Sequence, residues 1–387
     1  MNRLVLGLDV GGTSSRAVTT TLDGAVVGRG EAGGGNPLAV PPDLAAAEVA
    51  RALDGALAGT DPTRIAAAVL GLAGVSGFDR PETAAAFQRV WDAAGLRCPV
   101  HAVGDAQVAF ASGTGEPLGT VLIAGTGSAA ARIDGDRITR VGDGLGWLLG
   151  DKGSGFWIGR RAAADTAARL QAGRPPTLLT ELVVRAVLGD DRTATAGTYH
   201  HRGDGAGTAA REAAAGGRDP GTTAETAQRR RAAEPATGTA AGRDAPTAAT
   251  GAAATAQTKS PAAGGPPPAS DAFVIAVHQR PPRSLDRLAP LVTEAALAGD
   301  DHALAILDEA AVHLAAAVAN VRDPDETTPI VLSGSVLRGS APVRDGVRAR
   351  LAAAWPGAAV TEAGPAELGA AKLAAQRVQR SSTTPFS

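Results

Sequence analysis

The chain has 387 residues, of which 44% are hydrophobic and 20% are charged, and its formal net charge is −2. This length suffices for two domains with a sizeable core, and the near-neutral charge disfavours a nucleic-acid surface as the main function. The single cysteine, Cys98, excludes disulfide scaffolds, cysteine-rich zinc sites and cysteine-ligated iron–sulfur clusters within one chain. No uninterrupted apolar run reaches the length of a membrane span, and we expect a cytoplasmic protein that binds neither membrane nor nucleic acid.

Residues 1–115 predict three strands followed by alternating helices and strands. Apolar runs predict strands at 4–9, 16–21 and 25–30, and the Leu22-Asp23-Gly24 turn joins the last two as a hairpin. Helical periodicity at 42–57 and 83–94 alternates with strands at 65–72 and 99–103, and a further helix begins near Asp105. This order predicts a first domain that ends near residue 115.

The same order starts again near residue 116. Strands are expected at 120–124, 129–133 and 137–141, with an Asp134-Gly135 turn between the last two. Helices are expected at 156–170, 178–188, 284–298 and 302–321, followed by a strand at 329–332, a helix at 343–355, and a closing strand and helix at 358–361 and 365–378. The repeat predicts an α/β protein of two duplicated halves, the second spanning 116–387.

Residues 190–270 interrupt the second half. The segment is rich in Ala, Gly, Thr, Arg, Asp and Pro and has few large apolar residues, so we expect a disordered insertion. Its Arg229-Arg230-Arg231 run has two interpretations, a nucleic-acid contact or a solvated charge cluster, and the second is favoured. The His200-His201 pair has no neighbouring His or Cys and does not predict a metal site.

Two glycine-rich turns follow predicted strands. The strand at 4–9 carries Asp9 at its end and is followed by Gly11-Gly12-Thr13. The N–H groups of such a turn can approach a phosphate without Cβ interference, and the Asp9 carboxylate can hold the water shell of a phosphate-bound Mg²⁺. The strand at 120–124 is followed by Gly125-Thr126-Gly127-Ser128. Two such turns on separate strands predict a nucleotide held between two similar halves.

Asp105 stands where a predicted strand passes into a helix. Asp is common at the N-cap of a helix, and it can also serve as a general base in a cleft between the halves. The motif leaves both interpretations open.

A longer glycine-rich stretch follows at residues 142–155. Its glycines, the carboxylate of Asp151 and the apolar side chain of Trp147 suit a sugar or polyol site. The alternative is a tight turn before the next helix, with Trp147 in the core. By its spacing alone, Asn36 reads as an ordinary turn residue, whereas Ser333-Gly334-Ser335 suits the close approach of a base or ribose.

Together these stretches resemble the sugar-kinase branch of the actin/hexokinase/heat-shock chaperone ATPase superfamily, in particular the N-acetylglucosamine kinases of the BadF/BadG type. The resemblance covers nearly the whole chain except the insertion. It implies duplicated actin-like (ribonuclease H-like) ATPase domains around a central cleft that closes on ATP–Mg²⁺ and a hexosamine. The one cysteine departs from the zinc motif of the bacterial repressor/glucokinase group and from the iron–sulfur activases of the BadF type.

The resemblance also implies a role for each motif residue. Asp105 is implied as the catalytic base and as a substrate contact, and Asp9 as the acid associated with Mg²⁺. The implied ATP-binding residues are Gly11, Gly12, Thr13, Gly125, Thr126, Gly127, Gly334 and Ser335. The implied sugar contacts are Asn36, Gly146, Trp147 and Asp151.

The activity expected from this resemblance is ATP-dependent phosphorylation of the 6-hydroxyl of N-acetylglucosamine, which gives N-acetylglucosamine 6-phosphate and ADP. Glucosamine or another hexose is the alternative substrate, and a non-catalytic ATP-dependent sugar sensor is the alternative class of protein. The expected partners are the sugar and ATP, with Mg²⁺ as the metal cofactor and a homodimer as an option.

Overall fold

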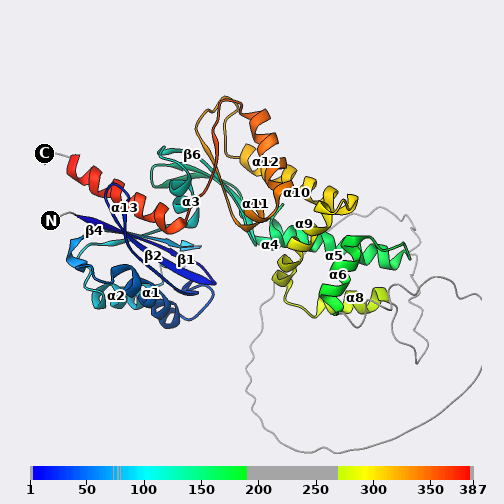
Figure 1. Ribbon diagram of the computed structural model, residues 1–387, viewed down its shortest axis with the longest axis horizontal. Coiled ribbons are helices and arrows are strands. Elements are labelled where there is room, and N and C mark those ends of the chain that lie inside the picture. Colours follow the sequence, from blue (N-terminus) through cyan, green and yellow to red (C-terminus); the bar gives the residue numbers. More distant parts are fainter. Residues whose placement is uncertain (1–2, 73, 76–77, 79, 190–268, 384–387) are drawn as a thin grey trace, which may run out of the picture. The chain divides into compact units, whose positions relative to one another are not determined.

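The computed structural model describes residues 3–72, 74–75, 78, 80–189 and 269–383 (Figure 1). The arginine run and the histidine pair of the predicted insertion lie outside the described residues, as does all of that insertion except its last two positions, where a helix begins.

The first half is built on a five-stranded sheet in the order β3-β2-β1-β4-β5. β1 lies antiparallel to β2 and parallel to β4, and β4 lies parallel to β5. The strands are β1 (Leu4–Val10), β2 (Ser14–Thr21), β3 (Val26–Gly33), β4 (Ile65–Leu72) and β5 (Val100–Gly104). All five were predicted to within a few residues.

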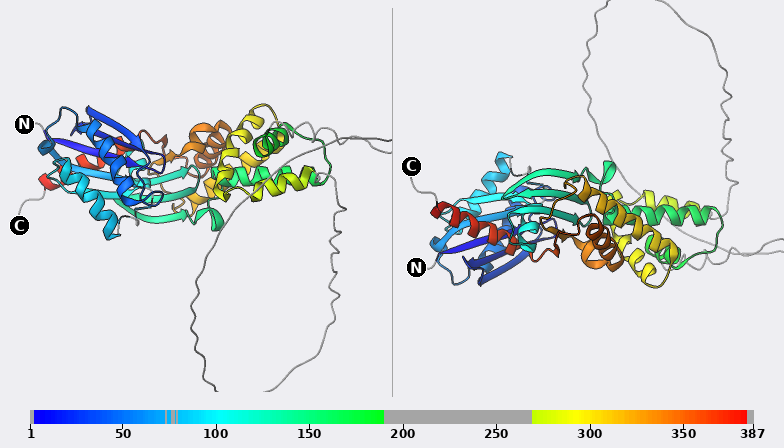
Figure 2. Two further views of the ribbon diagram at one scale, coloured as in Figure 1. Left: turned by 90° about the horizontal axis from the view of Figure 1, so that it is seen from below. Right: turned by 90° about the horizontal axis from the view of Figure 1, so that it is seen from above.

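Helices cover both faces of this sheet, because the alternating side chains of β1 point in opposite directions (Figure 2). Leu6 and Leu8 pack with residues of α1 and α2, whereas Val5 packs with residues of α3 and of the last helix, α13. These helices are α1 (Pro42–Leu57), α2 (Pro81–Ala93), α3 (Asp105–Gly113) and α13 (Ala366–Thr383), and the 3₁₀ turn η1 (Pro62–Arg64) precedes β4.

The second sheet repeats the first, with the order β8-β7-β6-β9-β10. β6 lies antiparallel to β7 and parallel to β9, as β1 does to β2 and β4. The strands are β6 (Leu118–Ala124), β7 (Ser128–Asp134), β8 (Arg137–Asp143), β9 (Ile330–Ser333) and β10 (Val360–Glu362). The predicted α/β class and the duplication are therefore confirmed.

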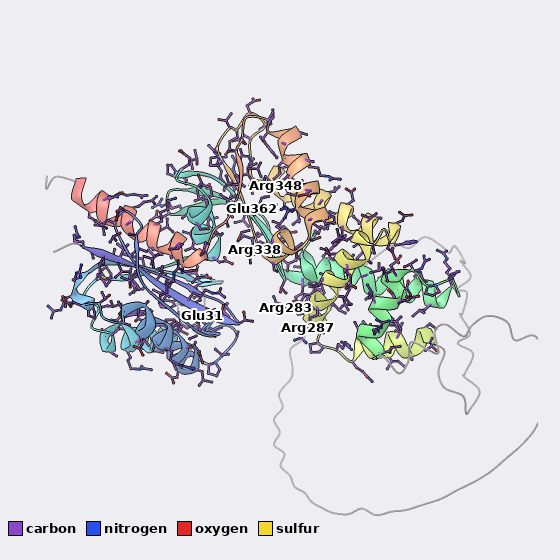
Figure 3. All side chains as sticks on the ribbon, in the orientation of Figure 1. Glu31, Arg283, Arg287, Arg338, Arg348 and Glu362 are labelled. Carbon is purple, nitrogen blue, oxygen red and sulfur yellow. The ribbon has the colours of Figure 1, made fainter. Side chains whose placement is uncertain are left out.

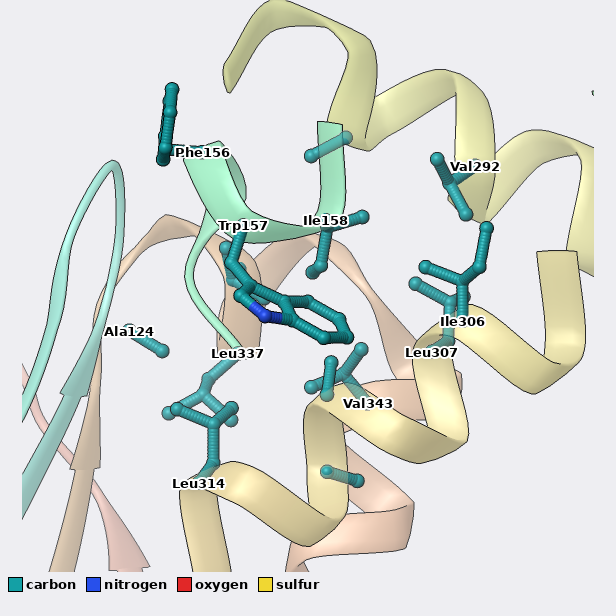
Figure 4. Packing of buried hydrophobic residues seen from close by; sticks show 14 of the residues in the cluster. Ala124, Phe156, Trp157, Ile158, Val292, Ile306, Leu307, Leu314, Leu337 and Val343 are labelled. Atoms are coloured by element: carbon teal, nitrogen blue, oxygen red, sulfur yellow. The ribbon is translucent and has the colours of Figure 1, made fainter. Parts of the chain in front are cut away.

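The second half carries a helical layer between β8 and β9 that the first half lacks. Figure 4 shows part of its core, where Trp157 and Ile158 of α5 lie with Ile306 and Leu314 of α10. The helices are α4 (Gly146–Leu149), α5 (Gly155–Gln171), α6 (Leu178–Leu188), α8 (Ala269–His278), η4 (Pro282–Leu288), α9 (Ala289–Leu297) and α10 (Asp301–Ala319), with α11 (Ser335–Gly339) and α12 (Ala341–Ala354) after β9.

Three features differ from expectation. The helix predicted at 284–298 is divided into the 3₁₀ helix η4 and the α-helix α9, whose second residue is Pro290. The last helix, α13, packs on the first sheet, where Leu373 joins the core with Val5. Among the described residues, α10 is long and apolar enough to cross a membrane, but a core helix passes the same test, and Ile306 and Leu314 are buried in the core.

Candidate active site

The first glycine turn begins directly after β1. The Gly11 carbonyl accepts the N–H groups of Gly35 and Asn36, each at 3.2 Å, and this fastens the turn to the segment after β3. Gly12 is exposed, and a Cβ added there would have Ala39 Cβ as its nearest non-adjacent neighbour, at 3.9 Å. Packing therefore does not require glycine at position 12, and the bare backbone leaves room for a ligand such as a phosphate.

Asp9, near the end of β1, lies in an acidic setting. Burial, together with the nearby carboxylates of Glu367 and Asp105, raises the pKa of Asp9 to about 6, although Arg16 acts to lower it. Arg16 is also paired with Glu31, whose position Figure 3 labels, at 3.0 Å. A half-buried carboxylate with surplus negative charge fits a hard cation such as Mg²⁺.

A group of three or more metal-ligating side chains is absent from the described part of the chain. Any Mg²⁺ at Asp9 would therefore rely on water and on substrate phosphates for its remaining ligands. This is the usual way in which proteins hold Mg²⁺.

Asp105 is the first residue of α3 and follows β5. The N-cap position belongs to Gly104, whose N–H donates to Gln107 Oε1 at 2.7 Å. Asp105 Oδ1 accepts only the adjacent Ala106 N–H, at 2.9 Å, among the bonds described for its side chain. Burial raises the pKa of Asp105 despite this bond. Of the two interpretations, the N-cap is wrong, and a half-buried carboxylate with a raised pKa suits a general base.

Asn36 has a structural role in the turn after β3. Its side chain is buried, and Oδ1 accepts the Leu38 N–H at 2.9 Å. This is the turn role that the spacing predicts. A sugar contact through Asn36 stays a prediction.

The second glycine turn is fastened to the start of α5. The carbonyls of Gly125 and Thr126 accept the N–H groups of Gly155 at 2.7 Å and Phe156 at 3.2 Å. The Thr126 hydroxyl donates to Asp286 of η4 at 2.9 Å. This turn is therefore held on two sides, whereas the first turn is open at Gly12.

The glycine-rich stretch that begins at residue 142 is a loop with the short helix α4 inside it. Trp147 is 39% exposed and lies edge-on to Phe156, with ring centroids 5.5 Å apart. The alternative of Trp147 as a core residue is therefore wrong. Leu148 and Leu149 are each 75% exposed. Gly146 has a φ of +79° and open space around its Cβ position. Apolar side chains exposed beside bare backbone suit a ligand-binding loop.

Asp151 lies at the end of this loop, against the second glycine turn. Its side chain is buried, and Oδ1 accepts the Ser128 N–H at 3.1 Å. A Cβ added at Gly127 would lie 3.0 Å from both carboxylate oxygens of Asp151. Burial raises the pKa of Asp151. The predicted sugar residue thus contacts the predicted phosphate turn, and its contact with a sugar stays a prediction.

A pocket of about 190 Å³ adjoins the second turn. Gly334 has a φ of +107°, and a Cβ there would lie 2.2 Å from the Ala124 carbonyl oxygen, so only glycine fits between β9 and α11. The pocket is lined by Gly125, Thr126, Gly155, Ile158, Asp286, Ala289, Pro290, Thr293, Ser335, Val336, Gly339 and Ser340. It therefore brings together Gly125, Thr126 and Ser335, which were predicted to bind ATP.

Three polar pocket residues were missed from the sequence. Asp286 follows Thr126 by 160 positions, and no spacing in the sequence links the two. Thr293 donates to the Ser340 hydroxyl at 2.9 Å, and both are buried. Asp286 lies on η4, Thr293 on α9 and Ser340 between α11 and α12, so only the folded chain brings them together.

A family model described as the BadF/BadG/BcrA/BcrD ATPase family matches residues 6–177. The match covers less than half of the chain, and over that range the chain is similar to this family. The matched range includes both glycine turns, Asp105 and the loop that carries Asp151.

Curated relatives match parts of this chain. An N-acetyl-D-glucosamine kinase from Dictyostelium discoideum is 28% identical over 190 residues, which are 47% of this chain and 59% of that protein. An N-acetylmuramic acid/N-acetylglucosamine kinase from Clostridium acetobutylicum is 36% identical over 90 residues, which are 23% of this chain and 29% of that protein. The chain therefore spans less than two thirds of the curated relatives that it matches.

Two solved structures resemble the whole chain. A candidate N-acetylglucosamine kinase from Chromobacterium violaceum has a TM-score of 0.61 and 21% identity, over 96% of this chain and 99% of that one. Another, from Porphyromonas gingivalis, has a TM-score of 0.55 and 17% identity, over 97% of this chain and 99% of that one. These likenesses show the fold of the chain, and the expected fold class is confirmed.

Three exposed arginines lie on the elements that form the pocket. Arg283 and Arg287 are on η4, and Arg338 is on α11 (Figure 3). None of the three forms an ion pair with another residue in the described ranges. Arg283 is close enough to Asp151 to lower the pKa of that carboxyl. Arginine side chains near a phosphate-type turn can offset the charge of a bound polyphosphate.

Proposed function

We propose that the protein is an ATP-dependent kinase that phosphorylates the 6-hydroxyl of N-acetylglucosamine. One observation carries the proposal. A half-buried carboxylate, Asp105, and the acidic residue Asp9 serve one half, while a glycine turn beside a pocket of about 190 Å³ serves the other. Phosphoryl transfer requires positioning, charge neutralisation and a proton acceptor, and these features supply all three. The curated relatives named as kinases of N-acetylglucosamine support the substrate.

In this proposal the nucleotide occupies the pocket of the second half. Its base and ribose would lie among Ile158, Pro290, Thr293 and Ser340, and its phosphates would reach the turn at Gly125. The N–H groups of Gly12 and Thr13 would contact the phosphates from the first half. Mg²⁺, held at Asp9 through water, would neutralise charge on the phosphates.

Asp105 would accept the proton of the sugar 6-hydroxyl. As that proton leaves, the hydroxyl oxygen attacks the γ-phosphorus, a new O–P bond forms, and the bond to the leaving ADP oxygen breaks. The products are the sugar 6-phosphate, ADP and one proton. A raised pKa brings Asp105 closer to the pH at which a base works most effectively.

The loop around Asp151 would hold the sugar. Its exposed apolar groups, with Trp147, would lie against the ring, and the Asp151 carboxylate would accept hydrogen bonds from hydroxyls. Because ATP is the donor, we place the protein in the cytoplasm.

The test is a substrate screen with purified protein and ATP–Mg²⁺. N-acetylglucosamine, glucosamine, glucose and N-acetylmannosamine would be compared by coupled ADP release and by mass spectrometry of the sugar phosphate. We expect N-acetylglucosamine 6-phosphate to form in a one-to-one ratio with ADP. A higher rate with glucosamine or glucose would identify that sugar, and not N-acetylglucosamine, as the preferred substrate. Binding of both ligands without product would instead identify a sugar sensor.

A further inference from the structure

The loop at residues 144–152, which carries Asp151, is called the sugar loop below. Ser128, the last residue of the second glycine turn, is fastened to this loop by three hydrogen bonds. Its N–H donates to Asp151 Oδ1 at 3.1 Å, and its hydroxyl donates to the Lys152 carbonyl at 2.9 Å. Its own carbonyl accepts the Gly144 N–H at 3.1 Å. These bonds therefore join the end of the phosphate turn and the two ends of the sugar loop in one hydrogen-bonded unit.

Asp143 holds the far end of this unit in place. Its Oδ1 accepts the Asp151 N–H at 2.7 Å, and its Oδ2 accepts the Lys152 N–H at 2.9 Å. A carboxylate that accepts two N–H groups makes bonds about twice as strong as neutral ones. Both oxygens of Asp143 thus bind the backbone on which the Asp151 carboxylate is mounted.

The backbone at both aspartates is strained. Asp143 has a φ of +61° and Asp151 a φ of +56°, and among the described non-glycine residues only these two have a positive φ. The left-handed region is unfavourable for a residue with a Cβ. The two carboxylates also lie close enough for Asp143 to raise the pKa of Asp151. A residue that served stability alone would avoid both costs, and such strain clusters at functional sites.

Gly150 leaves room for the Asp143 carboxylate. A Cβ added to Gly150 would lie 2.1 Å from Asp143 Oδ1, which no real contact allows. Gly150 has a φ of −149° and a ψ of −131°, and this ψ lies outside the regions open to residues with a Cβ. Both the backbone conformation and the room needed by the Asp143 carboxylate therefore favour glycine at this position.

We propose that Asp143 is a positioning residue that couples the sugar loop to the second phosphate turn. It fixes Asp151 and, through Ser128, the end of the turn, so that a sugar bound at one and a nucleotide bound at the other favour each other. This inference rests on the proposed function, because it takes the loop as the sugar site and the turn as the phosphate site. Asp143 itself contacts neither ligand.

The experiment measures this coupling directly. Calorimetry would give the Kd of adenylyl imidodiphosphate–Mg²⁺ with and without saturating N-acetylglucosamine, for the full chain and for Asp143→Ala and Asp143→Asn. We expect the sugar to tighten nucleotide binding in the native protein. In Asp143→Ala that tightening is lost, and kcat/KM for the sugar falls about 10- to 100-fold. Asp143→Asn keeps one acceptor oxygen and should lie between the two.

Two matched variants separate positioning from a general structural effect. Asp61→Ala removes a carboxylate that also accepts a backbone N–H, that of Thr63 at 2.9 Å, but in an exposed turn of the first half. It should change neither the coupling nor kcat/KM. Gly150→Ala keeps Asp143 but displaces its carboxylate, and it should reproduce the loss. Gly115→Ala, at a position where a Cβ has open space, is its control.

The outcomes distinguish the inference from the proposed function. A native protein that makes no sugar phosphate, or that binds neither ligand, overturns the proposed function and with it this inference. An active native protein with full coupling in folded Asp143→Ala overturns only the role of Asp143. If Asp143→Ala does not fold, as judged by circular dichroism, Asp143→Asn and Gly150→Ala decide. Normal coupling in both would overturn the inference.

Discussion

The two sheets have the same strand order and the same strand directions, yet they present different chemistry at the end of their first strands. β1 carries Asp9 there, next to a turn that is open at Gly12. β6 ends in Ala124, and its turn is fastened to α5, η4 and the loop proposed to bind the sugar. One scaffold therefore supports an ionisable acid in one half and a neutral, rigid turn in the other.

This difference indicates how the two halves of a duplicated fold can take different roles in one reaction. The packing of β1 and β6 is alike, because both central strands are buried between helices on two faces. Divergence is confined to strand ends and to the layer inserted between β8 and β9. That layer supplies Asp286 and Thr293, so the second half gains a pocket next to its turn. The predictions below test whether acid chemistry belongs to the first half and ligand positioning to the second.

The largest expected effect is at Asp105. Asp105→Asn keeps the shape of the side chain but cannot accept a proton, so kcat should fall about 10²- to 10⁴-fold. Calorimetry should show nearly unchanged binding of nucleotide and sugar. A kcat within a few-fold of the native value would show that Asp105 is not the catalytic base, and the first half would then not supply one.

We expect the ionised carboxylate of Asp9 to lower the stability of the fold while it supports the function of the site. Its raised pKa of about 6 means that the folded state binds more protons than the unfolded state between about pH 4 and 6. The unfolding free energy therefore falls as pH rises through this window. Asp9→Asn should remove this loss and stabilise the protein by about 1–3 kcal/mol at pH 7, with little change below pH 4.

Urea denaturation at pH 4 and pH 7 would check the stability of Asp9→Asn, and a Mg²⁺ titration of kcat would check its function. We expect a more stable protein that needs more Mg²⁺. A variant that is less stable at pH 7 would show that the Asp9 carboxylate contributes to folding and is not held there at a cost.

The sequence predicted the elements well wherever hydrophobic periodicity is strong. α1, β4 and α6 have the predicted bounds, because their apolar positions follow one period from end to end. The second sheet could be predicted because it repeats the first. The division of 284–298 into η4 and α9 could not, since both pieces bury apolar residues at similar spacing.

The site was predictable at strand ends and not where contacts cross long distances in the sequence. Asp9 and Asp105 follow or end apolar runs, so their placement can be read from the pattern. The bond between Thr126 and Asp286 spans 160 positions and has no local signal. The left-handed backbone of Asp143 was also hidden, because an aspartate before glycine is typical of any turn.

Asp151→Ala tests whether the second half positions both ligands. The carboxylate is expected to accept sugar hydroxyls, and it also holds the Ser128 N–H of the phosphate turn. We expect kcat/KM for the sugar to fall about 10- to 100-fold, with a smaller loss of nucleotide affinity. Steady-state kinetics with each substrate varied in turn would measure both. Unchanged sugar kinetics would place the sugar site elsewhere.

The smallest effect is expected where the turn meets η4. Thr126→Val removes the hydroxyl that donates to Asp286 at 2.9 Å while keeping the volume of the side chain. A single hydrogen bond of this kind contributes about 0.5–1.5 kcal/mol, so KM for ATP should rise about 2- to 10-fold. KM for the sugar should be unchanged, because the bond lies on the side of the turn away from Ser128. Thr21→Val, which removes a hydroxyl from the hairpin turn of the first half, is the matched control and should change neither KM. If Thr126→Val raises both KM values equally, loss of this one hydrogen bond affects the whole turn. The contributions of the second half to ATP binding and to sugar binding would then not be separable.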